Sequence, residues 1–157
     1  MTRRHAMLLL LSTLAAACGR KTRLRPPEDV RPTAPDNIIA KAVPEGLLLS
    51  WSRPTEYTGG DRMRDLARFE VQRAVDRGGP LAYEMRTNFE LTDRFRFQKA
   101  KRIEWTDTDV VEGQRYLYRV IAITADEDRS DPGGPIAVDY HRPPPAPPKA
   151  QPATPAP

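Results

Sequence analysis

The chain has a single cysteine, Cys18, and only two histidines, His5 and His141, among its 157 residues. One cysteine cannot form an internal disulfide, so any folded domain must be held together by its apolar core. A histidine-dependent base or a catalytic triad also lacks a partner, because Cys18 lies far from His141 in the sequence and has another predicted role. We therefore expect no enzyme activity, no metal site and no cofactor.

Long hydrophobic runs are missing as well. The apolar stretch at residues 7–14 is interrupted by Ser12 and Thr13, and roughly a dozen apolar residues fall short of the ~20 that a permanent membrane helix needs. Basic residues precede this stretch, and three alanines follow it directly before Cys18. Because this order is typical of a secretory signal, we predict that residues 1–17 are a cleaved signal peptide.

The residues Leu14-Ala15-Ala16-Ala17-Cys18 resemble the bacterial lipobox, at which a signal peptidase cuts before a cysteine whose thiol carries diacylglycerol. Ala15 stands where the lipobox usually has leucine. The resemblance implies that Cys18 is lipidated and attaches the chain to a membrane. Three alternatives stay open: a plain secretory signal with a free thiol, an inverted anchor favoured by the basic residues after Cys18, and twin-arginine export through Arg3 and Arg4.

Proline is concentrated near the two ends of the chain, at positions 26–35 and 143–157. Such sequences bury little apolar surface and favour extended polyproline II conformations. We therefore assign residues 18–34 to a basic tether, residues 35–141 to a globular domain and residues 142–157 to a disordered tail. The basic residues at 20–25 form either a solvated tether or a contact with anionic lipid head groups, and a recognition peptide is the alternative for the tail.

Short segments of alternating apolar and polar residues, separated by turn residues, fill the central region. Each has the two-residue period of a strand with one buried face. They lie at 47–51, 69–71, 89–91, 95–97, 103–105, 116–122 and 136–140. This spacing predicts an all-β fold, an antiparallel two-sheet sandwich. Residues 62–68 are the exception, and we expect a short turn of helix there.

Residues 105–122 resemble the passage between strands E and F of fibronectin type III domains. In that family an aromatic residue precedes Thr-Asp, an apolar residue lies six before a tyrosine, and a glycine lies three before it. Trp105, Val110, Gly113 and Tyr116 hold these positions, and segments 47–54 and 69–73 resemble strands B and C. The resemblance implies a fibronectin type III or immunoglobulin-like sandwich in which Tyr116 forms a tyrosine corner. The expected structural core residues are Trp51, Phe69, Val71, Trp105, Tyr116, Tyr118 and Val120.

Two acidic groups and one basic group are candidates for binding. Residues 107–113 are spaced like part of a calcium loop, but Glu112 stands where that loop needs glycine. For the acidic loop 126–131 we expect a solvated turn, with a weak metal site as the alternative. The candidate partner surface consists of Arg94, Arg96, Lys99, Lys101 and Arg102. A solvated hairpin is the other interpretation of this basic patch, and without interleaved aromatics it does not indicate nucleic acid.

We therefore expect a lipid-anchored bacterial envelope protein with a non-catalytic binding or scaffolding domain. Its expected contacts are the membrane, through the lipid on Cys18, and an unidentified envelope protein or glycan. An aspartate directly after the lipidated cysteine resembles an inner-membrane retention signal. This chain has Gly19 at that position, which favours the outer membrane, facing the periplasm. One alternative is an envelope assembly factor, because residues 18–24 are similar to the start of a small lipoprotein that assists lipopolysaccharide transport, with Thr22 where that start has glycine. The other is an accessory glycan- or peptidoglycan-binding protein.

Overall fold

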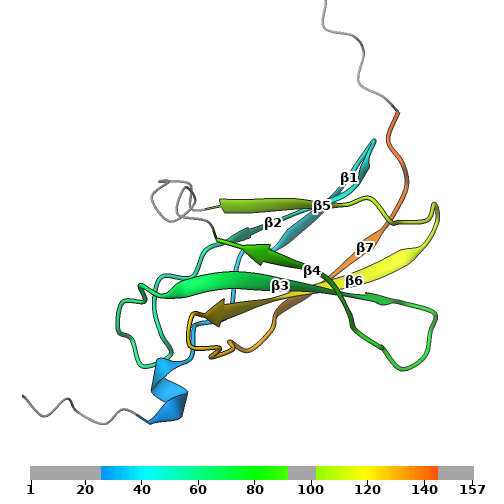
Figure 1. Ribbon diagram of the computed structural model, residues 1–157. Helices are drawn as coiled ribbons and strands as arrows, with labels where there is room; N and C mark the ends of the chain where they lie inside the picture. Colours follow the sequence, from blue (N-terminus) through cyan, green and yellow to red (C-terminus); the bar gives the residue numbers. More distant parts are fainter. Residues whose placement is uncertain (1–25, 92–101, 145–157) are drawn as a thin grey trace, which may run out of the picture.

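Residues 26–91 and 102–144, which the computed structural model describes, form two antiparallel β-sheets packed face to face (Figure 1). The first sheet has the order β1 (Ile39–Val43), β2 (Gly46–Ser52), β5 (Arg102–Asp107). The second has the order β4 (Glu84–Glu90), β3 (Leu66–Val75), β6 (Arg115–Thr124), β7 (Gly133–Asp139). The predicted all-β sandwich is confirmed.

The turn between β1 and β2 shows why glycine is needed at one position. Gly46 has a φ of +151°, and a Cβ atom placed there would lie 2.1 Å from the carbonyl oxygen of Asp107 on β5. Any side chain at this position would therefore collide with the neighbouring backbone. With Gly46 in place, β2 pairs with both β1 and β5, and Leu49 lies opposite Trp105.

The core lies between the sheets and is built from the inward positions of the period-two segments. Trp51 is fully buried and packs edge-on against Phe69, with a distance of 5.6 Å between ring centroids. Phe89 approaches Trp51 from β4 at 6.3 Å. Of the seven expected core residues, six are buried, whereas Trp105 is only partly buried and packs against the core from β5, an edge strand.

The expected helical turn at 62–68 is wrong. Arg62 forms an isolated antiparallel bridge with Glu56, and Leu66 and Arg68 already belong to β3 and pair with β6 across a bulge. Pairing with β6 satisfies this backbone and buries Leu66 at 1% exposure. Strand β1 is an element that the alternation did not predict, and the segment expected at 95–97 lies outside the described residues.

Residues 28–34, which the sequence pattern places in the tether, contact the domain. Their first three residues belong to a 3-10 helix at Pro27–Val30. The hydroxyl of Thr58 donates hydrogen bonds to the carbonyl oxygens of Glu28, at 2.6 Å, and Arg31, at 2.9 Å. The Arg31 guanidinium reaches the β6–β7 loop, where it bonds the Arg129 carbonyl and the Asp131 carboxylate, each at 2.9 Å. We call residues 28–34 the strap.

Candidate functional site

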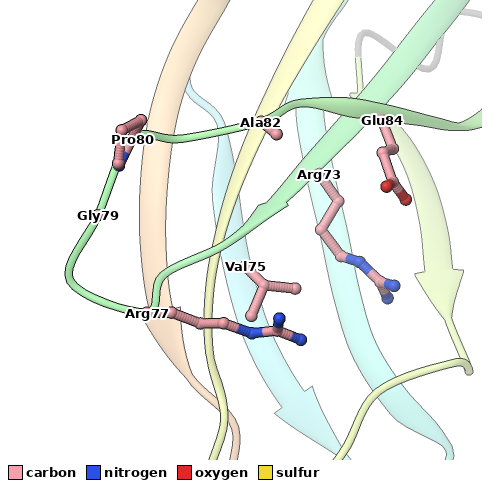
Figure 2. Close-up of a pocket in the computed structure, with 7 residues that line it drawn as sticks. All are labelled: Arg73, Val75, Arg77, Gly79, Pro80, Ala82 and Glu84. Atoms are coloured by element: carbon pink, nitrogen blue, oxygen red, sulfur yellow. The ribbon is translucent and has the colours of Figure 1, made fainter.

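A pocket of about 300 Å³ lies at the β3–β4 hairpin (Figure 2). Its volume is at the lower end of the roughly 300–1,000 Å³ that is typical of small-molecule sites. The end of β3, the connecting loop and the start of β4 supply its walls. The lining residues are Arg73, Val75, Arg77, Gly79, Pro80, Ala82 and Glu84.

The loop that forms one wall has turn chemistry of its own. The backbone N–H of Gly78 donates to the Asp76 carboxylate at 3.0 Å, which is an Asx turn, and Gly78 has a φ of +77°. The Asp76 N–H donates to the Arg115 carbonyl at 3.0 Å, so the loop is attached to β6 at its first residue. Pro80 then restricts the backbone on the far side of the turn.

Arg73, on the inner side of the pocket, is held by a buried carboxylate. Its guanidinium bonds Asp107 at 2.8 Å, and the two side chains are 11% and 2% exposed. The hydroxyl of Tyr118 donates to the same Asp107 oxygen at 2.9 Å, and the Arg73 guanidinium lies 4.9 Å from the centroid of the Tyr116 ring. Because these contacts fix it from several sides, Arg73 is a rigid wall of the pocket.

The buried charges shift the pKa values of their neighbours. Burial lowers the pKa of Arg73, but the charge of Asp107 and the contacts with Tyr118 and Asp107 together outweigh burial and place that pKa above its ordinary value. Burial and the Asp107 charge both raise the pKa of Tyr118 far above the usual tyrosine value. Arg73 is therefore a permanent cation, and Tyr118 a permanent hydrogen-bond donor, at neutral pH.

Arg77 and Glu84 differ from Arg73, because both are exposed and neither forms an ion pair with another described residue. Figure 2 shows Arg77 reaching from the loop toward the same space as Arg73, while Glu84 extends from β4. Glu84 lies opposite Arg73 in the β3–β4 register. The pocket therefore offers one available cation and one available anion, on different walls.

Tyr116 lies where the tyrosine corner requires it. The backbone N–H of Val111 donates to the Tyr116 hydroxyl at 2.9 Å, and the Tyr116 ring is 2% exposed. The hydroxyl thus accepts a hydrogen bond from the turn that connects β5 and β6.

Trp51 differs from Tyr116, because its indole Nε1 is buried without a hydrogen-bond partner among the described residues. Its aromatic neighbours Phe69 and Phe89 surround it instead.

Most of the predicted basic patch, as well as Cys18, lies outside the described residues. Arg102 is described and begins β5. Its guanidinium donates to the Ser50 hydroxyl at 2.7 Å and to the Asn37 carbonyl at 3.3 Å. Because these bonds hold the Arg102 side chain against its own domain, Arg102 is not free to bind a partner. The other four residues of the basic patch stay a prediction.

The acidic loop at 126–131 is paired with arginines. Glu127 binds Arg68 through both carboxylate oxygens, and Asp131 binds Arg31. Within residues 26–91 and 102–144, no cluster of three or more acidic, histidine or cysteine side chains could hold a metal ion. The expected solvated turn therefore also carries contacts that hold the strap and β3.

A polar row on the outer face of the second sheet was not predicted. The Arg119 guanidinium stacks on Tyr83, 4.0 Å from the ring centroid, and also binds Gln72. Glu70 accepts from Gln72 and pairs with Arg129 at 2.8 Å. The alternation along the two strands predicts that positions 70, 72 and 119 face solvent. The pairing of β3 with β6 places Gln72 beside Arg119.

The comparisons with known proteins concern the fold alone. No protein-family model matches the chain, and no curated protein matches it. Among solved structures, the twitchin kinase region from C. elegans matches with a TM-score of 0.50 and 18% identity over 71% of this chain. This chain covers 17% of that twitchin chain.

Two further solved structures are similar. A Fn3-like protein from Clostridium thermocellum matches with a TM-score of 0.47 and 19% identity, covering 71% of this chain and 95% of that one. The third fibronectin III domain of a human protein matches with a TM-score of 0.48 and 10% identity, covering 85% and 100%. The chain has a fibronectin type III-like fold, as the sequence resemblance implied. Within the described residues, no helix has the length and apolar character to span a membrane.

Proposed function

We propose that this protein is a lipid-anchored component of the bacterial cell envelope, whose fibronectin type III-like domain acts as a non-catalytic binding module. The lipid would be carried by Cys18, directly after the alanines that complete the lipobox-like sequence. The observation that carries the proposal is the strap. It fixes the point at which the chain enters the domain, about ten residues after that cysteine.

The strap and the pocket lie at opposite ends of the sandwich. Arg31 and its neighbours contact the β2–β3 and β6–β7 loops, next to the start of β3, while the pocket lies where β3 ends (Figure 1). A ten-residue strand such as β3 is roughly 30 Å long. In a chain anchored at Cys18, the pocket would therefore lie at the end of the domain opposite to the point where the anchored segment enters.

Labelling cells with radioactive palmitate tests the anchor. The unaltered chain should incorporate label and pellet with membranes, whereas Cys18→Ser should incorporate none and appear in the soluble fraction. Thr22→Ser, a nearby change of similar size, is the matched control and should behave like the unaltered chain. Equal membrane pelleting of Cys18→Ser would refute the lipid anchor and favour a retained apolar segment.

Protease added to intact spheroplasts tests the orientation. An exported domain is digested without lysis, while an inverted anchor leaves the domain protected until the cells are broken. Digestion that occurs only after lysis would refute export. Together with the palmitate result, this separates an exported lipoprotein from a plain secretory protein and from an inverted anchor.

A further inference from the structure

We infer that the β3–β4 pocket binds a small zwitterion with an aliphatic body, such as a short peptide that has a free amino end and a free carboxyl end. This inference rests on the proposed function, because it gives the binding module a ligand class. Three features of the pocket carry it: an available cation, an available anion, and a small apolar surface in the same lining.

The cation is Arg77. A guanidinium offers two parallel N–H donors to a carboxylate, which makes it the preferred side chain for this group. Arg73 lines the same pocket, but its Nη1 already binds Asp107 and the backbone carbonyl of Asp109, and its Nη2 lies 3.5 Å from the Asp109 carboxylate. The ligand carboxylate would therefore bind Arg77, with the fixed positive charge of Arg73 nearby.

The anion is Glu84. It is exposed at the first position of β4 and has no ionic partner among the described residues. A lone carboxylate here would weaken the binding of a purely anionic ligand. A ligand that also carries an ammonium group gains a contact at Glu84, so the charges of the pocket favour a zwitterion.

The apolar surface consists of Val75, Pro80 and Ala82. These side chains are short, and none can donate or accept a hydrogen bond. Methyl or small alkyl side chains suit such a surface, and a pocket of about 300 Å³ has room for a ligand the size of a dipeptide. Arg73 and the Asx turn are already fixed, so the ordering on binding falls mainly on the side chains of Arg77 and Glu84.

The experiment uses three probes that differ in their terminal charges: alanyl-alanine, its N-acetyl derivative and its C-terminal amide. Each is titrated by calorimetry into the full chain in a non-ionic detergent. Alanyl-alanine should bind most tightly. Loss of either terminal charge should weaken binding roughly tenfold, as expected when one charged hydrogen-bonding group is removed.

Two variants assign each charge to its residue. Arg77→Gln should abolish the preference for the free carboxylate over the amide, while the preference for the free amine is kept. Glu84→Gln should do the reverse. Arg64→Gln and Glu90→Gln, which remove exposed charges away from the pocket, are the matched controls and should keep both preferences. A purely structural role for Arg77 or Glu84 would not separate the two preferences in this way.

Equal binding of all three probes would overturn the inference, and so would no detectable heat at about 10 mM alanyl-alanine. Binding of the acetylated probe alone would show a simple anion site and would also contradict it. Circular dichroism of each variant confirms that the fold is intact. Because the titrations depend on the pocket and the palmitate labelling on Cys18, a failure of one is distinguishable from a failure of the other.

Discussion

Replacement of Asp107 by asparagine should be among the most damaging single changes in the domain. Asp107 is 2% exposed and accepts hydrogen bonds from the Arg73 guanidinium at 2.8 Å, the Tyr118 hydroxyl at 2.9 Å and the Asp109 N–H at 3.1 Å. All three partners are donors. Asparagine keeps the shape of the side chain, but its amide nitrogen is itself a donor, so at least one of these three donors would face another donor. The charge of Arg73 would also lose its buried counter-charge.

The expected cost follows from the burial of the pair. Breaking a buried ion pair on one side typically costs about 3–5 kcal/mol. Arg73 keeps a second contact with Asp109, 3.5 Å from its carboxylate, so we expect the lower end, about 3 kcal/mol. In a domain of this size, that loss lowers the melting temperature by roughly 12 °C or more.

Urea unfolding of the full chain, followed by circular dichroism, measures this loss. Asp139→Asn is the matched control: it makes the same chemical change in the Arg115–Asp139 pair, whose side chains are 50% and 56% exposed. Exposed pairs contribute less than about 1 kcal/mol. If the two variants lose stability within about 0.5 kcal/mol of each other, the buried pair does not have the role assigned to it.

Three other changes test the core and its titrating groups in the same unfolding assay. Trp51→Ala should cost about 3–5 kcal/mol through lost burial and a cavity, and a near-neutral result would contradict its central position. Tyr116→Phe should cost about 1–3 kcal/mol by leaving the Val111 N–H unpaired, whereas no change would refute the corner hydrogen bond. Tyr118 has a raised pKa in the folded state, so stability is fully present below pH ~10 and falls above it by up to about 1.4 kcal/mol per pH unit. Tyr118→Phe should remove that alkaline slope, and a persistent slope would contradict the assignment.

The strands that the sequence predicted best are those with large apolar residues on one face. In β6, Tyr116, Tyr118 and Val120 face the core at every second position, so the period was visible. In β1 the inward residues are Ala40 and Ala42, and the large Ile39 is 52% exposed. Small inward residues and an exposed isoleucine hide the alternation, which explains why β1 was missed.

The buried ion pair could not be predicted, because it joins residues that are distant in the sequence, and the pocket could not be predicted, because it depends on the register of one hairpin. The run at 76–80 predicted a turn, but not that the register of β4 would place Glu84 opposite Arg73. The sequence placed Asp107 in a calcium-like loop and in the Thr-Asp motif of the fibronectin type III resemblance, but not beside an arginine. Its partners Arg73 and Tyr118 come from two strands of the opposite sheet, and only the packing of the sandwich brings them together.

The most direct test of a domain displayed on a membrane through Cys18 is the intact mass of the mature protein from its native membrane, with mass analysis of the N-terminal peptide. The expected result is a chain that begins at Cys18, lacks residues 1–17 and carries diacylglycerol on the thiol. A chain that still begins with the signal segment, or a Cys18 with a free thiol, would contradict the lipid anchor.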